Sequence, residues 1–255
     1  MILAIFEPRV SSARAEEICK KTRLDKFEKV EAKGFAGGIW LFWDSNLVEI
    51  DLLASTDHVL TCLVKRKDDV NWILSAVYAS PCPSAREGLW DYLLNLSKSI
   101  SLPWLVAGDL NEVTEGSKKI RGKPISLRRC QQFLDCIDKC GLMDLGFSGP
   151  SFTWSNMRKG RGVIKERLDR ALCNQAWRMH FTEAWVRHLP RTCSDHHPIL
   201  IHVTAETNLV GTNRPFRFEA AWLTHDQFKD VLRANWQVDL DLASVIDRLD
   251  RKSVV

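Results

Sequence analysis

The chain has 255 residues, of which 45% are hydrophobic and 27% are charged, an ordinary composition for a folded globular protein. This composition argues against extended disorder and allows one large hydrophobic core or two smaller ones. No apolar run approaches the roughly 18 residues that span a bilayer, so we expect no membrane partner. The net charge of +4 permits an anionic partner without identifying it.

The eight cysteines indicate reduced thiols in an intracellular protein. They form no Cys-x-x-Cys pair, which argues against a zinc site. The first residues do not have the charged and apolar pattern of a secretory signal peptide, so we do not expect disulfides. Cys136 and Cys140 lie four residues apart on a predicted helix, and we interpret them as buried small apolar residues rather than as a pair of thiolates.

The first part of the chain predicts strands and one short helix. Residues 1–6 form an apolar run typical of a buried strand, and residues 12–21 predict a surface helix. The apolar run at 39–43 and the alternating pattern at 48–52 predict two strands, which we expect to pair as a hairpin.

The next segment predicts an antiparallel meander, a helix and a buried strand. Strands are expected at 60–64 and 72–78, separated by a charged turn. Pro81, Pro83 and Ser84 are expected to end the sheet and cap the helix. Its apolar stripe, ended by Pro103, comprises Leu89, Trp90, Leu93, Leu94 and Leu96. The strand at 104–107 leads directly into Gly108-Asp109, and the end of a strand is a usual position for catalytic groups.

The last part of the chain contains a further helix, three strands and a change of composition. Apolar residues recur at helical spacing from Ser126, and Gly141 marks the end of that helix. Strands are predicted at 152–154, 167–172 and 198–203. The polar segment 204–215 is predicted to be a linker, and 216–255 a helical extension.

Six polar side chains lie beside or at the ends of these predicted strands: Glu7, Asp109, Asn111, Asp169, Asp195 and His196. Hydrolysis of a phosphodiester requires a cation, a group that positions and deprotonates water, and donors that hold the phosphate. Carboxylates, amides and a histidine can supply these functions. Each residue alone has an ordinary structural interpretation as a turn former, a cap, a surface carboxylate or a salt-bridge partner.

The ordered motifs resemble those of the endonuclease/exonuclease/phosphatase superfamily over residues 1–203. They are Phe6-Glu7, Val77-Tyr78, Gly108-Asp109-Leu110-Asn111, Arg167-Leu168-Asp169 and Ser194-Asp195-His196-His197-Pro198. Within the superfamily, the chain most resembles the endonuclease domain of plant LINE-type (non-LTR) retrotransposons. That resemblance is carried by residues 7–11, by 30–32 with 34–40, and by 217–222.

The resemblance implies a role for each motif residue. Glu7 and Asp195 are expected to bind Mg²⁺, for which Mn²⁺ can substitute, because carboxylate oxygens are suitable ligands for this ion. Asp109 is expected to orient or deprotonate water, and Asn111 and Tyr78 to hold the scissile phosphate. His196 is expected to stabilise the developing charge or to transfer a proton, with Asp169 fixing its ring. We interpret His197 as structural.

Two basic stretches follow the motifs and predict a DNA-binding surface on either side of the cut. The first comprises Lys118, Lys119, Arg121, Lys123, Arg128 and Arg129, and the second comprises Arg158, Lys159, Arg161, Lys165, Arg167 and Arg170. A solvated basic face is the alternative interpretation.

The resemblance also implies a fold: a four-layer α/β/β/α sandwich of two mainly antiparallel sheets, of class α+β. The family's first strand, which ends in a metal-binding Asn within Trp-Asn-x-Arg-Gly, is missing from this sequence. Its loss would weaken both stability and activity. The reverse transcriptase that follows the nuclease in such elements is also absent, and a retrotransposon nuclease would need access to the nucleus.

The preferred hypothesis is an Mg²⁺-dependent DNA endonuclease of retrotransposon origin, weakened or inactive in this chain. A second hypothesis keeps the same chemistry but has a phosphatase or phosphodiesterase acting on a smaller phosphoester. A third is a non-catalytic remnant that binds nucleic acid.

Overall fold

A computed structural model describes residues 1–8, 14–32, 37–67 and 69–203. The chain divides into two units, Met1–Ala205 and Glu206–Val255, and every described residue belongs to the first unit. The predicted linker at 204–215 and the helical extension at 216–255 therefore lie outside the described residues. Within those residues, no helix is long and apolar enough to cross a membrane.

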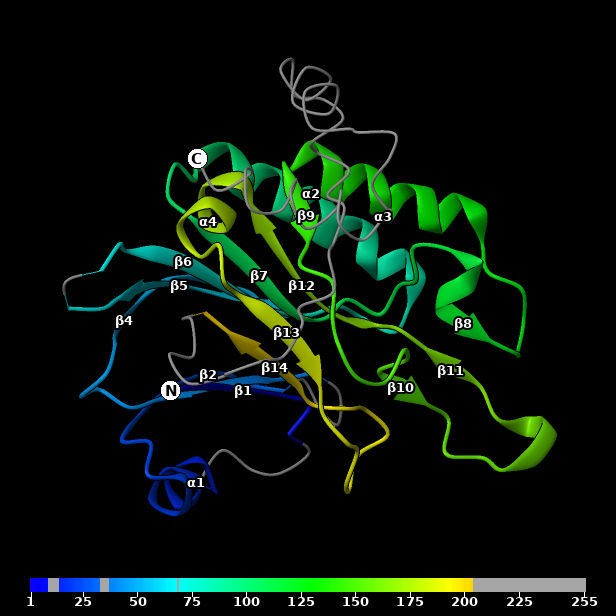
Figure 1. Cartoon of the computed structure of the whole chain (residues 1–255), viewed down its shortest axis with the longest axis horizontal. Helices are drawn as coiled ribbons and strands as arrows, with labels where there is room; N and C mark the ends of the chain where they lie inside the picture. Colours follow the sequence, from blue (N-terminus) through cyan, green and yellow to red (C-terminus); the bar gives the residue numbers. More distant parts are fainter. Residues whose placement is uncertain (9–13, 33–36, 68, 204–255) are drawn as a thin grey trace, which may run out of the picture. The chain divides into compact units, whose positions relative to one another are not determined.

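A six-stranded sheet forms the centre of the first unit (Figure 1). Its strands, in spatial order, are β4 (Glu49–Ser55), β5 (Val59–Lys65), β6 (Trp72–Tyr78), β7 (Trp104–Asp109), β12 (Asp169–Asn174) and β9 (Leu142–Asp144). All neighbours pair antiparallel except β6 and β7, which are parallel. A parallel pair needs a crossover, and the helix α2 (Pro83–Ser99) provides it.

Two helices cover one face of this sheet (Figure 1). They are α2 and α3 (Leu127–Lys139), and Trp90 of α2 stacks on Phe133 of α3 with ring centroids 4.9 Å apart. Their apolar residues form one core cluster with the side chains of β5, β6, β7 and β12. The buried residues of α2 include Leu89, Trp90 and Leu93, as the predicted stripe requires.

Two smaller sheets cover the other face. One contains β1 (Ile2–Phe6), β3 (Ile39–Trp43) and β2 (Lys26–Val30), and the other contains β13 (Trp185–His188) and β14 (Ile199–His202). Both contribute to a core cluster shared with the six-stranded sheet. Helix α1 (Arg14–Thr22) covers the outer face of β1, β3 and β2 through Ala15 and Ile18. The layers are therefore helix, sheet, sheet and helix, as predicted.

The remaining elements are short. A three-stranded sheet joins β10 (Trp154–Ser155), β11 (Lys165–Glu166) and β8 (Lys119–Ile120), and α4 (Gln175–His180) follows β12. Two single 3-10 turns occur at Gly116–Lys118 and Gly160–Gly162. Among the described strands, β1 pairs only with β3 and β14 only with β13.

The predicted hairpin between residues 39–43 and 48–52 is wrong. All five residues of β3 are buried, and β3 pairs with β1 on one side and with β2 on the other. The half-exposed β4 instead pairs with β5 in the six-stranded sheet, with an irregularity between Leu52 and Ala54. A fully buried strand needs partners on both sides, so the turn after β3 carries the chain to a different sheet.

The predicted cap of α2 also needs correction. The residue at its N-cap position is Cys82, with Pro83 at the first helical position, and Ser84 lies inside the helix. Proline is favoured there because the first helical N–H groups have no partner within the helix. The helix α3 begins as predicted, since the Ser126 hydroxyl accepts a hydrogen bond from the backbone N–H of Arg129 at 3.5 Å.

Candidate active site

The candidate active site is built around the end of β7. In the parallel ladder with β6, Tyr78 is in register with Asp109, and in the antiparallel ladder with β12, Asp169 is in register with Asp109. Three residues that are far apart in sequence therefore meet at one edge of the sheet. Tyr78 is buried in the core between the sheets, and Asp109 and Asp169 are both buried.

Gly108 explains how β1 comes close to this edge. Its φ is +141°, and a Cβ atom there would collide with the carbonyl oxygen of Val77 and lie 2.7 Å from the Phe6 ring. Only glycine leaves room for this approach. Glu7 follows Phe6 with a φ of 50°, and its charge acts on Asp109. The motifs Phe6-Glu7 and Gly108-Asp109 are thus brought together.

Asp109 and Asn111 form a compact turn after β7. The Asp109 carboxylate accepts hydrogen bonds from the backbone N–H of Asn111 at 2.9 Å and from its side-chain amide at 2.8 Å. The same amide donates to the carbonyl oxygen of Ala79 at 2.8 Å, which joins this turn to the segment after Tyr78. Asn111 has a φ of 49°, a conformation that asparagine tolerates better than most residues.

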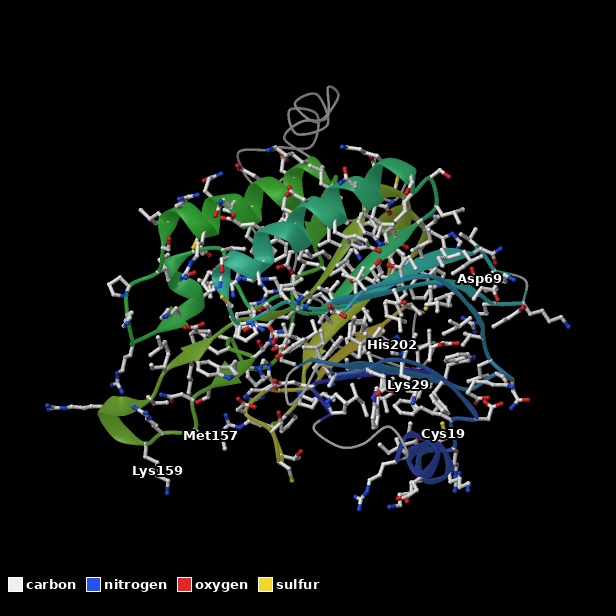
Figure 2. All side chains as sticks on the ribbon, turned by 180° about the vertical axis from the view of Figure 1, so that it is seen from behind. Cys19, Lys29, Asp69, Met157, Lys159 and His202 are labelled. Atoms are coloured by element: carbon white, nitrogen blue, oxygen red, sulfur yellow. The ribbon has the colours of Figure 1, made fainter. Side chains whose placement is uncertain are left out.

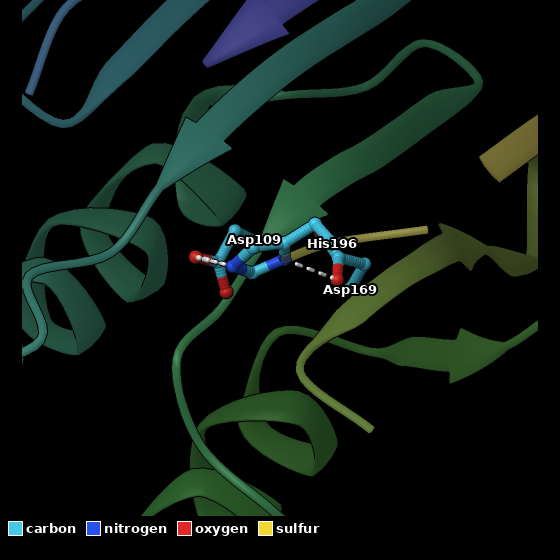
Figure 3. Close-up of side chains that lie close together, drawn as sticks. All are labelled: Asp109, Asp169 and His196. Carbon is cyan, nitrogen blue, oxygen red and sulfur yellow. Dashed lines mark hydrogen bonds and ion pairs between the residues drawn. The ribbon is translucent and has the colours of Figure 1, made fainter. Parts of the chain in front are cut away.

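His196 lies between the two buried aspartates (Figure 3). Its Nδ1 is 2.9 Å from Oδ2 of Asp169, and its Nε2 is 3.9 Å from Oδ2 of Asp109. The hydroxyl oxygen of Thr153 holds the backbone at Asp169 in place, because it accepts hydrogen bonds from the backbone N–H groups of Leu168 and Asp169 at 2.9 and 3.0 Å. Asp169 therefore holds the His196 ring in one orientation.

The environment of this group raises two pKa values, those of His196 and Asp109. Burial would lower the pKa of His196, but the hydrogen bond and charge of Asp169, with the charges of Asp109 and Asp195, raise that pKa to about 9. Burial and the charge of Asp169 raise the pKa of Asp109 to about 7, and Glu7 acts in the same direction. Near neutral pH, His196 is a cation and Asp109 can take up a proton.

Asp195 is exposed beside this group. Its Oδ2 accepts a hydrogen bond from the indole Nε1 of Trp154 at 2.9 Å, and its backbone oxygen accepts one from Ser155 at 3.0 Å. Trp154 also forms a β-bridge with His196. The strand β10 thus holds the Ser194-Asp195-His196 motif against the end of β12.

The donor set can accommodate a divalent cation. Asp109, Asp169 and His196 present ligand atoms within 4.8 Å of one another. His196 is nevertheless a poor ligand here, because its Nδ1 is bonded to Asp169 and its raised pKa keeps the ring protonated. The carboxylates fit a hard cation better, since burial and the negative charges of Asp169 and Glu7 together raise the pKa of Asp109. A cation at these oxygens would relieve that repulsion.

The small sheet brings the two basic stretches together. β8 pairs with β11, Lys119 is 2.6 Å from Glu166, and Nη1 of Arg121 donates to the carbonyl oxygen of Gly160 at 2.7 Å. Lys118 pairs with Glu115 at 3.1 Å. Arg158, Lys159 and Arg161 are exposed on the loop between β10 and β11, and Figure 2 shows Met157 and Lys159 on this projecting loop.

Two arginines of the second basic stretch do not belong to an exposed surface. Arg167 and Arg170 are 5% and 2% exposed, and their guanidinium groups each donate to Asp144 at 2.8 Å. Arg167 also lies over the Phe147 ring, 4.4 Å from its centroid. Arg170 in β12 and Arg167 just before it both bind Asp144 of β9 and are too deeply buried to reach DNA, so the prediction that they contact DNA is wrong.

Other residues of the site are not identified by the sequence. The sequence pattern assigns Thr153 and Trp154 only to a strand. A buried ion pair, Arg86–Glu112 at 2.7 Å, fixes the segment after Asn111. The occurrence of a glutamate directly after Gly-Asp-Leu-Asn and of an arginine inside an apolar helix face are the signals that the sequence offers, but neither gives the pairing.

Comparison with known proteins places this geometry in a family. Residues 13–196 match the model of the Endonuclease/Exonuclease/phosphatase family. None of the curated proteins compared with the chain matches it. Several solved structures share its fold at low sequence identity.

Three of those structures are an endonuclease domain, a 3′ phosphatase and TDP2. The endonuclease domain of TRAS1, a telomere-specific non-LTR retrotransposon, is 14% identical with a TM-score of 0.57, over 78% of this chain and 95% of that one. The 3′ phosphatase NExo from Neisseria, in a structure with a bound product DNA hairpin, is 17% identical with a TM-score of 0.57, over 80% and 89%.

The third structure is truncated TDP2 from Caenorhabditis elegans, which is 16% identical with a TM-score of 0.52, over 78% of this chain and 82% of that one. These similarities establish the fold, and the family match covers most of the chain, including the segments that carry Asp109, Asp169 and His196. The chain belongs to the Endonuclease/Exonuclease/phosphatase family.

Proposed function

We propose that this protein is an Mg²⁺-dependent endonuclease that nicks DNA, with an origin in a LINE-type retrotransposon. The observation that carries the proposal is the arrangement of His196 between Asp169 and Asp109, with Nδ1 2.9 Å from Asp169 and Nε2 3.9 Å from Asp109. A protonated imidazole beside a carboxylate of near-neutral pKa supplies both a cation for the phosphate and an acceptor for the proton of water.

The pKa values and contacts of the residues support the proposed roles. Asp109, whose pKa is about 7, accepts the proton of the attacking water, because a general base works best when its pKa lies near the working pH. His196, held by Asp169 with a pKa of about 9, stabilises negative charge on the phosphate oxygens rather than acting as the base. The family resemblance assigns the binding of the phosphate to Asn111 and Tyr78, which lie on adjacent chain segments.

Glu7 and Asp195 are the residues proposed to hold Mg²⁺. Both carry charges that act on the central group, Glu7 on Asp109 and Asp195 on His196. The bound ion supplies Lewis-acid stabilisation of the charge that develops on the phosphate. Mn²⁺, which also prefers oxygen ligands, is expected to substitute for it.

The proposed DNA surface comprises the two basic stretches that the small sheet joins, without the buried Arg167 and Arg170. Within the described residues, no ion pair engages Arg121, Arg158, Lys159 or Arg161, so their charges are free to contact phosphates. Lys118 and Lys119 lie at the base of this surface. Solved relatives of the same fold support DNA as the partner, since one is bound to a product DNA hairpin and the TDP2 of D. rerio to a single-strand DNA product.

The retrotransposon origin is supported by the sequence motifs and by the fold that the chain shares with the endonuclease domain of TRAS1. The structures of this fold also include a phosphatase, NExo, so the substrate must be determined directly.

The decisive experiment is nicking of supercoiled plasmid DNA. We expect nicking with Mg²⁺, none with EDTA, and a loss of at least about a hundredfold in a His196→Ala variant. His180→Ala is a matched control, because His180 lies on α4 and pairs with Asp69 at 2.8 Å. Equal nicking by all samples, including the one with EDTA, would reject cleavage by this site.

Two other outcomes would select the alternative functions. Turnover of small phosphoesters, such as nucleotides, without plasmid nicking would identify a phosphatase or phosphodiesterase that acts on smaller substrates. DNA binding retained in an Asp195→Ala, His196→Ala double variant, with no turnover of any substrate by the parent protein, would identify a non-catalytic nucleic-acid-binding remnant.

A further inference from the structure

A hollow of about 330 Å³ lies beside the candidate active site, and no catalytic or metal-binding role has been assigned to the residues that line it. Its size is at the lower end of the range of about 300 to 1,000 Å³ typical of small-molecule sites. The residues that matter for its chemistry are Phe152, Trp154, Ser155, Lys165, Arg191 and His197. We refer to it as the Phe152 hollow.

The Phe152 hollow adjoins the residues proposed to cut the strand. Trp154 lines it and also donates to Asp195 at 2.9 Å and bridges to His196. His197 follows His196 directly in the chain, and its backbone N–H donates to the carbonyl oxygen of Thr153 at 2.6 Å. The hollow is therefore within reach of a nucleotide next to a phosphate at His196.

The lining combines aromatic surface with positive charge. Phe152 and Trp154 are aromatic, and nucleobases of any kind can stack on aromatic rings. Lys165 is exposed and Arg191 half-buried, and in the described part of the chain no ion pair neutralises either of them. A nucleotide can be bound by such a lining, because aromatic rings stack on its base and cationic side chains attract its phosphate.

Polar groups in the hollow add hydrogen-bonding capacity. Nδ1 of His197 is 2.8 Å from the carbonyl oxygen of Leu189. A carbonyl oxygen only accepts, so Nδ1 carries a proton, and Nε2 is the ring nitrogen left for a further hydrogen bond. The Ser155 hydroxyl can both donate and accept. These groups suit the amino and hydroxyl groups of a nucleotide.

We propose that the Phe152 hollow binds one nucleotide of the DNA strand adjacent to the phosphate that is cut. Its base packs against Phe152 and Trp154, and its phosphate lies at Lys165 and Arg191. This inference rests on the proposed function for the identity of the strand, and it assigns a base-binding subsite to residues outside the predicted catalytic and metal-binding sets.

The first test is an abasic scan. DNA duplexes of one sequence are prepared, each with a single position that has no base, and their affinities are measured in EDTA so that no cleavage occurs. We expect one position at which loss of the base weakens binding about tenfold, the size expected for one stacked base. In a Phe152→Ala variant this penalty should disappear. A Phe152→Leu variant is the control for a folding defect in Phe152→Ala: it should keep the melting temperature of the parent protein and still lose the penalty, because leucine has no aromatic ring.

The second test separates the phosphate from the base. Arg191→Ala and Lys165→Ala should weaken every duplex of the scan by a similar factor and leave the positional penalty in place. Lys98→Ala is the matched control, because Lys98 is exposed at the end of α2 and should change neither quantity. Trp154 is not substituted, since it also holds Asp195.

The outcomes distinguish this proposal from the proposed function. A protein that nicks plasmid but shows no sensitive position, or keeps the positional penalty in Phe152→Ala, overturns the subsite and leaves the nuclease intact. A protein that shows the Phe152-dependent penalty without nicking keeps the subsite and refutes the nuclease. If no duplex binds, deoxyadenosine 5′-monophosphate is titrated with inorganic phosphate as the comparison. Equal affinity for the two then overturns the subsite, and tighter, Phe152-dependent binding of the nucleotide supports it.

Discussion

The buried ion pair between Arg86 and Glu112 should be one of the most costly polar contacts in the protein to break. The two side chains are 5% and 6% exposed, and Nη2 of Arg86 is 2.7 Å from Oε2 of Glu112. Nη1 of Arg86 also donates to the carbonyl oxygens of Ser80 and Pro81 at 2.9 and 3.2 Å. One guanidinium thus joins the segment after Tyr78 to the segment after Asn111.

The substitution Arg86→Met keeps much of the volume and removes the charge. Glu112 then stays buried with only two weaker partners, the backbone N–H of Val113 at 3.2 Å and Nε of Arg129 at 3.5 Å. Loss of one partner of a buried pair costs about 3–5 kcal/mol of unfolding free energy. Because domains of this kind are stable by about 5–15 kcal/mol, the variant should be only marginally folded.

The double variant Arg86→Met, Glu112→Leu separates the cost of an unpaired charge from the cost of lost packing. Well-packed apolar replacements of a buried pair are often neutral, so the double variant should lie within about 2 kcal/mol of the parent. Urea denaturation monitored by tryptophan fluorescence measures all three proteins. The exposed pair Lys118–Glu115 provides the control, since Lys118→Met should change stability by less than about 1 kcal/mol.

Two results would refute this reasoning. A single Arg86→Met variant that loses less than about 1 kcal/mol would mean that water or Arg129 satisfies Glu112 in solution. A double variant that is destabilised by the sum of the two single variants would mean that the two side chains act independently and not as a pair.

Three further predictions concern the site and the DNA surface. In cation-free protein, an NMR titration of His196 should have its midpoint near pH 9. Protonation of His196 then stabilises the fold fully below about pH 6.5, the ordinary pKa of histidine, and this stabilisation is lost as the pH rises through 9. Because Asp169 is the main cause of the raised pKa, Asp169→Asn should shift the midpoint downward. Gly108→Ala should cost at least about 2 kcal/mol in thermal unfolding, because the new methyl group collides with the carbonyl of Val77. Lys159→Ala should reduce the slope of log affinity against log salt by about 0.9 if it contacts one phosphate, and an unchanged slope would remove it from the DNA surface.

The sequence predicts most of the large sheet because its strands carry local signals. The buried runs at β6 and β7 match the nearly full burial of these strands, and the apolar residues of β4 indicate a strand although Leu52 and Leu53 are exposed. Strand partners are not encoded in the same way. The periodicity at β3 and β4 is compatible with a hairpin, but the continuous burial of β3 is the mark of an interior strand.

The site could be predicted only in part, for a similar reason. Motif order identifies Asp109, Asp169 and His196, and the ladders of β7 with β6 and β12 then bring them together. The supporting contacts depend on pairings between distant segments, which a single sequence does not reveal. Thr153 meets the backbone of Asp169 only because β10 and β11 pair, and Arg167 is buried rather than exposed only because β9 lies beside β12.

The charge balance of the site links its fold to its proposed chemistry. The negative charges of Asp169 and Glu7 both act on Asp109, and among the described residues His196 is the cation that offsets them. Such an excess of negative charge would repel a phosphodiester. Because the pKa of Asp109 is raised to about 7 by burial and this crowding, a divalent cation at Glu7 and Asp195 should lower it again, which couples cation binding to proton release. An enzyme of this design should therefore bind its cation more tightly as the pH rises, and bind DNA productively only when the cation is present.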